Sequence, residues 1–323
     1  MTGPETPQDF QQFTFWDGLL EQDAARLLRS ALDEDLGEAG DLTTQSLIDP
    51  HHRTAACVVM RERGVVAGLR AVELVCEIGA PSVRWEHHRT DGDDIVAGAI
   101  VTTLSGLACE LLAVERTLLN VLGRLCGIAT LTRQYVEQVE GTGAAIYDTR
   151  KTTPGWRRLE KYAVKQGGGR NHRTGLFDAI LIKDNHLAIQ ADGGMVGESS
   201  VADAVRRARQ WLRETYDHRR FAHELPVGER IVEVEVDTLE QFAEILALPE
   251  TMLPDIVLLD NMTPKIMTAA VSLRNARAPS VLLEASGGVC LDKLRCIAES
   301  GVDRISVGRL THSAISLDLG LDW

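Results

Sequence analysis

Two short motifs, DTRKTTPGWR and GGGRNHR, place cationic side chains where they could bind an anion. Arg150 and Lys151 follow an apolar stretch, and His172 and Arg173 follow three glycines. A planar guanidinium binds a carboxylate or phosphate through two hydrogen bonds, and a lysine adds a point charge. The basic residues between the motifs have the spacing of a solvated helix face: Arg157, Arg158 and Lys161. The two motifs therefore favour a small substrate with several negative charges.

The triple glycine at residues 167–169 does not match a nucleotide-binding loop. The sequence lacks the pattern GxxxxGK followed by Ser or Thr, and no GxGxxG motif opens a helix after a strand. We interpret the glycines as a turn that brings His172 and Arg173 beside Arg150 and Lys151.

Carboxylates form a second candidate group. In IVEVEVDT the two-residue period of a strand puts Glu233, Glu235 and Asp237 on one face and valines on the other. A buried carboxylate needs a partner, and Lys183 at the end of AILIK is the partner expected for one of the glutamates. Asp260 ends the apolar stretch IVLLD and could meet sugar hydroxyls or a hydrated cation. Oxygen ligands suit Mg²⁺, and no His/Cys cluster has transition-metal spacing.

Glycine-containing turns end two late apolar stretches, in EASGGV and ISVGRLTH. Ser286, Gly287 and Gly288 belong to the first turn and Gly308 to the second. Loops after the late strands of βα barrels frequently bind phosphate through backbone N–H groups. The sequence therefore predicts a phosphate seat separate from the cationic motifs.

Six apolar stretches position these residues, beginning at 144, 179, 231, 255, 280 and 304. Three successive intervals are about 25 residues, which is typical of strand–helix units around a parallel sheet. Every stretch ends in polar or glycine residues. Because the active sites of parallel barrels lie at the carboxyl ends of the strands, this pattern favours a closed or nearly closed barrel over an open doubly wound sheet.

Composition restricts the class of protein further. The chain has 323 residues, 44% hydrophobic and 25% charged residues, and a formal net charge of -13. This excess of acid argues against a nucleic-acid surface, and no apolar run approaches the ~20 residues that span a bilayer. The six cysteines are scattered without a CxxC pair, which indicates buried free thiols in a reducing, cytoplasmic compartment.

Taken together and in order, the motifs closely resemble the quinolinate phosphoribosyltransferase family. They are ALDEDLGEAGDLTT, ERTLLNVLGRLCGIAT, DTRKTTPGWR, EKYAVKQGGGRNHR, LIKDNH, VEVEVD, VLLDNM, EASGG and ISVGRLTHS. The resemblance covers roughly residues 25–320. It implies that quinolinate and phosphoribosyl pyrophosphate react to give nicotinate mononucleotide, pyrophosphate and CO₂, with Mg²⁺ required. It also implies a homodimer, or a higher oligomer, with active sites shared between subunits.

The resemblance implies an α/β fold, with an N-terminal α/β sandwich domain beside an incomplete TIM-like α/β barrel. We accordingly predict a disordered lead at residues 1–18 and the sandwich domain at 19–125. The barrel domain is predicted at 126–305, and a C-terminal segment at 306–323 returns towards the N-terminal domain.

The resemblance also implies a role for each matched residue. Quinolinate would be bound by Arg116, supplied by the partner subunit, and by Arg150, Lys151, His172 and Arg173. Phosphoribosyl pyrophosphate would be bound by Lys183, Glu235, Asp260, Ser286, Gly287, Gly288, Gly308 and His312. The catalytic residues would be Lys151, Lys183, Glu235 and Asp260, of which the last two would also face Mg²⁺, directly or through water.

Two features of the sequence depart from the family pattern, and three alternative functions are open. Arg309 lies where the family more often has a small residue, and the insertion at about 191–230 is longer than usual. The alternatives are a relative associated with molybdenum transport, a nicotinate phosphoribosyltransferase, and a non-catalytic binding protein on the same scaffold. A dicarboxylate substrate suits the number of cations better than a monocarboxylate does.

Overall fold

A computed structural model of the protein describes residues 16–192, 200–216 and 231–323. The chain divides into two compact units. The barrel unit comprises the described parts of 137–150 and 171–307. The sandwich unit comprises the described residues before 137, together with 151–170 and 308–323.

Some sequence predictions fall outside this description. Residues 1–15 of the predicted lead and residues 193–199 and 217–230 of the predicted insertion lie outside the described residues. The predicted domain boundaries stay predictions.

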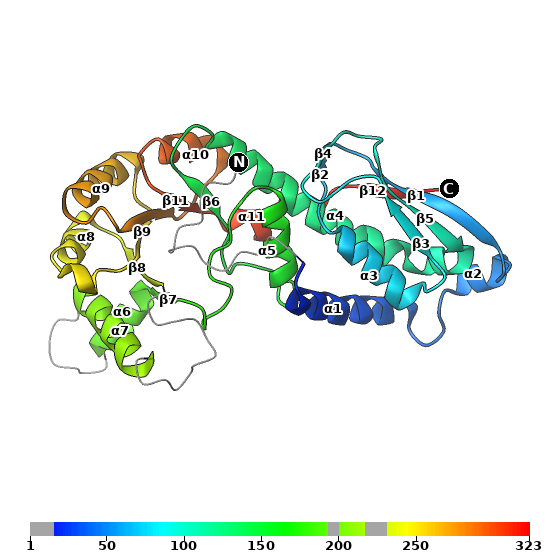
Figure 1. Ribbon diagram of the computed structural model, residues 1–323, viewed down its shortest axis with the longest axis horizontal. Helices are drawn as coiled ribbons and strands as arrows, with labels where there is room; N and C mark the ends of the chain where they lie inside the picture. Colours follow the sequence, from blue (N-terminus) through cyan, green and yellow to red (C-terminus); the bar gives the residue numbers. More distant parts are fainter. Residues whose placement is uncertain (1–15, 193–199, 217–230) are drawn as a thin grey trace. The chain divides into compact units, whose positions relative to one another are not determined.

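The described part of the barrel unit forms six parallel strands in the order β6-β11-β10-β9-β8-β7 (Figure 1). Their bounds are β6 Ala145–Tyr147, β7 Ile180–Ile182, β8 Val232–Val236, β9 Ile256–Asp260, β10 Leu282–Ser286 and β11 Arg304–Ser306. All six predicted strands are confirmed. Among the described residues β6 and β7 are edge strands and do not pair with each other, so the barrel is incomplete.

Helices cover the outer side of this sheet (Figure 1). They are α6 Asp184–Asp192, α7 Val201–Tyr216, α8 Leu239–Leu246, the 3₁₀ helix Glu250–Met252, α9 Pro264–Arg277 and α10 Leu291–Ala298. Local signals start several of them. Thr238 forms a capping box with Gln241 at the start of α8, and Thr263 caps α9 ahead of Pro264. These caps end the preceding loops close to the strand ends.

The sandwich unit contains an antiparallel sheet in the order β12-β1-β5-β3 and a small β2-β4 pair. The strands are β1 Arg53–Met60, β2 Gly64–Val65, β3 Arg84–His87, β4 Asp94–Ile95, β5 Ile100–Leu107 and β12 Leu319–Asp322. Strand β12 pairs with β1, from Met60 opposite Leu319 to Cys57 opposite Asp322. Residues that are distant in the chain therefore complete one sheet.

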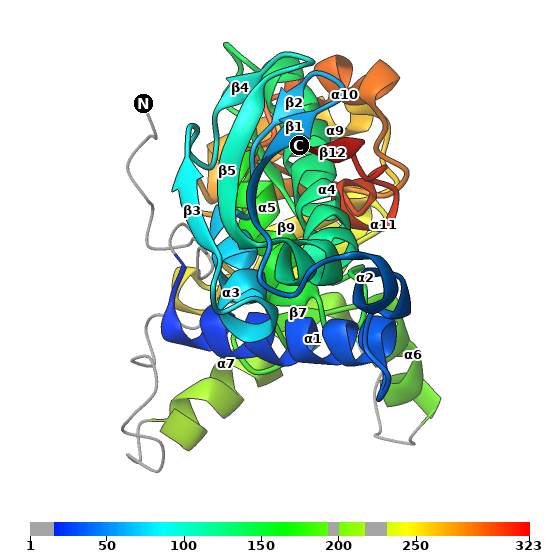
Figure 2. The same ribbon diagram turned by 90° about the vertical axis from the view of Figure 1, so that its right-hand side faces the viewer.

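The described residues of this unit form six helices, and Figures 1 and 2 show α3 and α4 on one face of the four-stranded sheet. They are α1 Gly18–Leu36, α2 Leu42–Leu47, α3 Leu69–Gly79, α4 Ala108–Gln138, α5 Arg157–Gln166 and α11 Arg309–His312. No helix in the described ranges is long and apolar enough to cross a membrane. The mixed α/β fold predicted from the sequence is confirmed.

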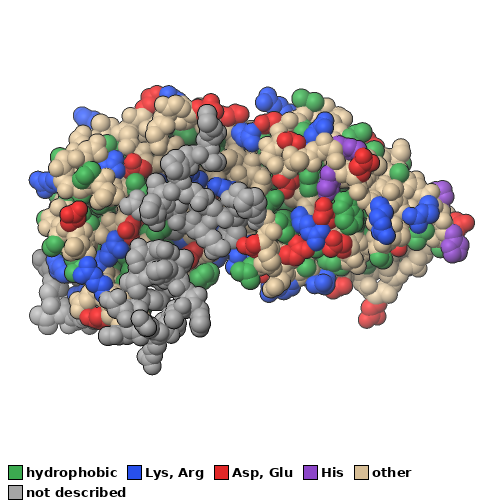
Figure 3. Space-filling view, viewed as in Figure 1, with side chains coloured by type: hydrophobic (Ala, Val, Ile, Leu, Met, Phe, Trp, Pro, Cys, Tyr) green, Lys and Arg blue, Asp and Glu red, His purple; other side chains and the backbone are tan. Residues whose placement is uncertain are grey.

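Helix α1 shows how the outer elements of this unit are held. Asp17 caps its first turn, and its buried side chains recur every four residues at Leu20, Ala24, Leu28 and Leu32. Glu21 on α1 pairs with Arg70 of α3, which also contacts Glu73 and Glu77 on its own helix. Figure 3 shows acidic and basic side chains intermixed over this surface rather than separated by sign.

The triple glycine ends helix α5, as the predicted turn requires. Gly168 has φ +90°, which favours glycine, and Gly167 and Gly169 pack against α4. A Cβ at Gly169 would lie 2.7 Å from the Thr132 side chain. The glycines thus serve a tight turn and a close helix contact.

Candidate active site

Polar side chains gather where strands β7 to β10 end, at a part of the barrel unit that we call the rim (Lys183, Glu235, Asp260 and Ser286). Lys183 Nζ lies 2.5 Å from Glu235 Oε2, and Asp260 and Ser286 are paired across β9 and β10. The predicted ion pair between Lys183 and a glutamate of β8 is therefore confirmed. Lys183 keeps 42% of its side chain exposed, so its ammonium remains accessible.

Acidic side chains outnumber basic side chains at the rim. Burial raises the pKa of Glu235, Lys183 opposes that change, and the charges of Asp260 and Asp184 raise the pKa further. Asp260 in turn accepts a hydrogen bond of 2.6 Å from Asn261 Nδ2. The charges of these carboxylates act on one another, and carboxylate oxygens are the ligands that Mg²⁺ prefers in proteins.

The turn after β10 is built for glycine. Gly287 has φ +90° and Gly288 has φ +58°, and a Cβ at Gly287 would collide with the Asn261 side chain. Asn261 itself has φ 51°, and its N–H donates to the Ser286 carbonyl at 2.9 Å. Strained backbone of this kind is frequent at ligand sites. The loops after β9 and β10 are thus held together beside Asp260.

Two guanidiniums of the barrel unit lie near each other. Burial lowers the pKa of Arg173, and the charge of Arg150 lowers it further. Arg173 is 6% exposed and donates from Nη1 to the Ala179 carbonyl at 3.1 Å. Because like charges repel, this arrangement favours an anion that both guanidiniums can contact.

His172 is buried below the rim, in a group that we call the inner cluster (His172, Glu233, Glu284 and Arg304). Its Nε2 lies 3.0 Å from Glu233 Oε2 and 3.4 Å from Glu284 Oε1. Its Nδ1 accepts a hydrogen bond of 2.8 Å from the Arg173 N–H. Both ring nitrogens therefore have protein partners, a detail that the sequence did not indicate.

Opposing effects act on the His172 ring. Burial lowers the pKa of His172, but Glu233 and Glu284 outweigh burial and raise that pKa to about 9. The hydrogen bond from Arg173 uses the lone pair of Nδ1. With Nδ1 accepting this hydrogen bond, the ring is neutral and its proton lies on Nε2, which faces the two carboxylates; protonation of the ring would break the hydrogen bond from Arg173.

Arg304 completes the inner cluster. Its Nε donates to Glu284 Oε2 at 2.8 Å, and its guanidinium lies 3.7 Å from the centroid of the Tyr147 ring. Glu284 is fully buried, and burial alone would raise its pKa, but His172 and Arg304 lower it. Ligand atoms of His172, Glu233 and Glu284 lie within 4.8 Å of one another, as in a metal site. Arg304 already supplies positive charge there, so we interpret the cluster as an ion-pair network.

Asp148 holds the segment that carries His172. Its two carboxylate oxygens accept hydrogen bonds of 2.8 Å from the Asn171 side chain and from the His172 N–H. Asp148 is fully buried at the end of β6. Asp148 is the first residue of the motif DTRKTTPGWR, and the sequence gave it no role.

The remaining predicted site residues lie in the sandwich unit. A Cβ at Gly308 would lie 2.9 Å from Lys151 Cδ and 3.3 Å from the His312 ring, so both side chains rest against this glycine. Arg309, the departure from the family pattern, is exposed at the start of α11. Lys151, Gly308 and His312 therefore form one group.

Arg116 lies elsewhere in the sandwich unit, on helix α4. Its side chain is 63% exposed, and its nearest acid is Glu115 at 3.9 Å. It lines a cavity of about 300 Å³ together with Asn120 and Asp318. Lys151 is not among the residues that line this cavity.

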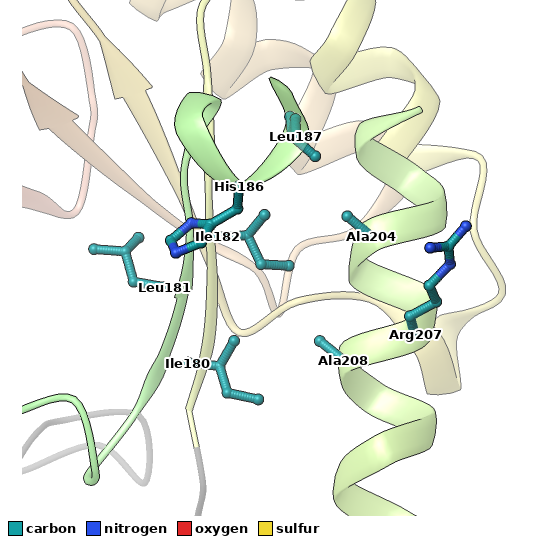
Figure 4. A pocket seen from close by; sticks show the side chains of 8 residues that line it. All are labelled: Ile180, Leu181, Ile182, His186, Leu187, Ala204, Arg207 and Ala208. Carbon is teal, nitrogen blue, oxygen red and sulfur yellow. The ribbon is translucent and has the colours of Figure 1, made fainter. Parts of the chain in front are cut away.

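A second cavity, of about 270 Å³, lies between β7 and helices α6 and α7 (Figure 4). Ile180 and Ile182 point into it from β7, while Leu181 points to the other side of the strand. Ala204 and Ala208 face it from α7. This cavity is mainly apolar and is not the rim site.

The open parallel barrel, its charged and glycine-bearing strand ends, and the antiparallel sandwich in the same chain define a class of two-domain enzymes that act on anionic substrates. Two family models match the chain: Quinolinate phosphoribosyl transferase, N-terminal domain, over residues 41–126, and Quinolinate phosphoribosyl transferase, C-terminal domain, over residues 128–322. The chain belongs to the quinolinate phosphoribosyl transferase family, and the family predicted from the motifs is confirmed.

Individual relatives match over nearly the whole chain. The nicotinate-nucleotide pyrophosphorylase [carboxylating] of Mycobacterium leprae is 44% identical over 305 residues, which cover 94% of this chain and 98% of that protein. The probable enzyme of the same name from Bacillus subtilis is 38% identical and covers 92% of each chain. The solved nicotinate-nucleotide pyrophosphorylase from Francisella tularensis has a TM-score of 0.82 and 32% identity, covering 97% of this chain and 99% of that chain.

Proposed function

We propose that the protein transfers the phosphoribosyl group of phosphoribosyl pyrophosphate to quinolinate with loss of CO₂. The products are nicotinate mononucleotide and pyrophosphate, and the reaction serves de novo NAD biosynthesis. The protein is thus a nicotinate-nucleotide diphosphorylase (carboxylating), a pentosyltransferase, like the relatives that share most of its length. The observation that carries this proposal is the pair of neighbouring guanidiniums, Arg150 and Arg173, in the same barrel unit as the acidic rim.

The dicarboxylate is bound mainly by arginine. Arg150 and Arg173 supply paired positive charge, and Lys151 follows Arg150 in the chain. Arg116 is supplied by the partner subunit, a role that its exposed side chain permits. His172 acts through Arg173, because its own ring nitrogens face the protein.

Phosphoribosyl pyrophosphate is bound by the rim and by glycine turns. Lys183 contacts its phosphates, and Glu235 and Asp260 face the ribose. Ser286, Gly287 and Gly288 supply the turn after β10. Gly308 and His312 serve the phosphate side, next to Lys151.

Catalysis rests on positioning and charge stabilisation. As pyrophosphate leaves, the ribose gains oxocarbenium character, which the carboxylates of Glu235 and Asp260 stabilise. Lys183 neutralises the departing phosphate oxygens, and Lys151 offsets the negative charge that decarboxylation builds on the ring. Glu235 and Asp260 would hold Mg²⁺, directly or through water, and the ion would neutralise pyrophosphate charge.

The proposal extends to assembly and location. An exposed Arg116 that completes the site of another subunit requires a homodimer or a higher oligomer. We place this oligomer in the cytoplasm, as expected from the unpaired cysteines. Analytical ultracentrifugation of the purified chain measures this directly. A monomer that turns over quinolinate at full rate would contradict the shared site.

One assay tests the function. The protein is incubated with quinolinate, phosphoribosyl pyrophosphate and Mg²⁺, and nicotinate mononucleotide and CO₂ are measured. Nicotinate replaces quinolinate in a parallel reaction. Product from nicotinate but not from quinolinate would refute the proposal, and omission of Mg²⁺ tests the metal requirement.

A further inference from the structure

Arg124 joins three segments of the sandwich unit from its place on helix α4. Its Nη2 lies 2.8 Å from Glu160 Oε1 on α5, and its Nη1 donates to the Ala314 carbonyl at 2.7 Å. Nη2 also donates to the Thr311 carbonyl in α11. One guanidinium on a 31-residue helix thus anchors α5, α11 and the residues after α11.

Glu160 extends these contacts to the loop that carries Lys151. The Glu160 side chain is fully buried. Besides Arg124 it accepts hydrogen bonds from the Thr153 N–H at 3.2 Å and from Thr153 Oγ1 at 2.9 Å. Because Thr153 lies two residues after Lys151, the buried carboxylate restrains this loop.

Thr311 links helix α11 to the loop that carries Lys151. Its hydroxyl is buried and lies 2.7 Å from the Lys151 carbonyl and 3.2 Å from the Gly308 carbonyl. The Lys151 side chain rests against Gly308, beside the His312 ring. The hydroxyl therefore lies between the two parts of the chain that the proposed function assigns to different substrates.

We propose that Arg124, Glu160 and Thr311 are positioning residues, which together we call the clamp, that hold Lys151 against Gly308 and His312. This inference rests on the proposed function, which gives Lys151 to the reacting centre and Gly308 and His312 to the phosphate side. A buried ion pair adds little net stability compared with apolar residues of similar volume. A rigid element that fixes the geometry of a site is instead what catalysis by positioning requires.

The sharpest test is a matched pair of variants at the buried hydroxyl. Thr311→Val keeps the shape but removes the donor, whereas Thr311→Ser keeps the donor. We expect Thr311→Val to lower kcat about 10-fold, with each KM changed less than about 3-fold, and Thr311→Ser to restore kcat. A rescued kcat with unchanged KM is not expected from a residue that only stabilises the fold.

Arg124→Met tests the anchor, with Arg70→Met as control. Arg70 also binds carboxylates and is similarly exposed, at 29% against 20% for Arg124, but its ion-pair partners in the described ranges are Glu21, Glu73 and Glu77, which are not site residues. We expect kcat to fall about 100-fold in Arg124→Met and to stay within about 2-fold in Arg70→Met, whatever the change in Tm. Because the clamp residues act as a unit, Arg124→Met with Thr311→Val should cost less than the product of the single effects.

The outcomes separate the clamp from the proposed function. A wild type that forms no nicotinate mononucleotide would overturn the function and the clamp with it. An active wild type with normal kcat in folded Thr311→Val would overturn the clamp alone. A crystal structure of Thr311→Val decides the positional claim without substrate: a displaced Lys151 supports it, and an unmoved Lys151 overturns it.

Discussion

The inner cluster and the rim of the barrel unit use the same strands but treat charge differently. Glu233 and Glu235 lie two residues apart on β8 and face the same side of the sheet. Glu233 is fully buried and faces His172, whereas Glu235 shares its ion pair with a half-exposed Lys183 and has a raised pKa. The inner cluster pairs its charges within the protein, although Glu233 Oε1 and Glu284 Oε1 are buried without a hydrogen-bond partner. The rim keeps unbalanced charge, which is the condition for binding an ionic ligand.

The largest effect should come from opening the inner cluster. Arg304→Met leaves Glu284 fully buried without its guanidinium partner. We expect the free energy of unfolding to fall by about 3–5 kcal/mol, measured by chemical denaturation. Arg206→Met, which removes an exposed pair with Asp203, should cost less than about 1 kcal/mol. Equal losses of unfolding free energy in the two variants would show that the buried inner cluster matters no more for stability than an exposed ion pair.

Part of that stabilisation depends on pH. His172 and Arg304 hold the pKa of Glu284 below its usual range despite burial. A lowered pKa in the folded state stabilises the protein above the unfolded pKa, and that stability is lost as pH falls through the folded pKa. The stability difference between wild type and Glu284→Gln should therefore shrink as pH falls from about 4.5 towards 2. A constant difference in denaturation curves across this range would contradict it.

At the site itself, Arg173→Ala should affect one substrate selectively. Removing one of the neighbouring guanidiniums should raise the Kd for quinolinate about 100-fold and that for phosphoribosyl pyrophosphate less than about 3-fold. Arg150→Ala should change the two Kd values in the same way. Isothermal titration calorimetry measures both ligands. An equal loss of affinity for both ligands would contradict the assignment of Arg173 to the carboxylates of quinolinate.

The smallest effect should come from the glycine turn after β10. Gly287→Ala forces a Cβ into a backbone with φ +90° and against Asn261. We expect the KM for phosphoribosyl pyrophosphate to rise about 10-fold while the Kd for quinolinate stays within about 2-fold. Steady-state kinetics with each substrate varied gives the comparison. Gly98→Ala, also at positive φ but in open space, is the control for backbone strain.

Much of this organisation follows from local patterns. The six strands, the polar strand ends and the pairing of Lys183 with a glutamate of β8 could be predicted, because period and position determine them. How deeply each of these side chains is buried could not be predicted in the same way. The two-residue period puts Glu233 and Glu235 on one face without saying which is fully buried.

Contacts between residues that are distant in the chain could not be predicted from the sequence either. Lys161 was expected on a solvated helix face, yet it is fully buried. The pairing of Arg124 on α4 with the buried Glu160 on α5 had no signal in the sequence. His172 next to Arg173 suggested two similar ligands, whereas the fold turns the imidazole towards buried acids. Such contacts depend on tertiary packing of residues far apart in the chain.

The pairing of β12 with β1 has a consequence for the order of folding. Residues 53–60 are synthesised early, but their edge partner, residues 319–322, leaves the ribosome only after the whole barrel unit has been made. The barrel unit can therefore complete its core while the sandwich sheet still lacks a strand. During that interval the edge of β1 is open to pairing with other chains, and this nascent state is the one most exposed to aggregation.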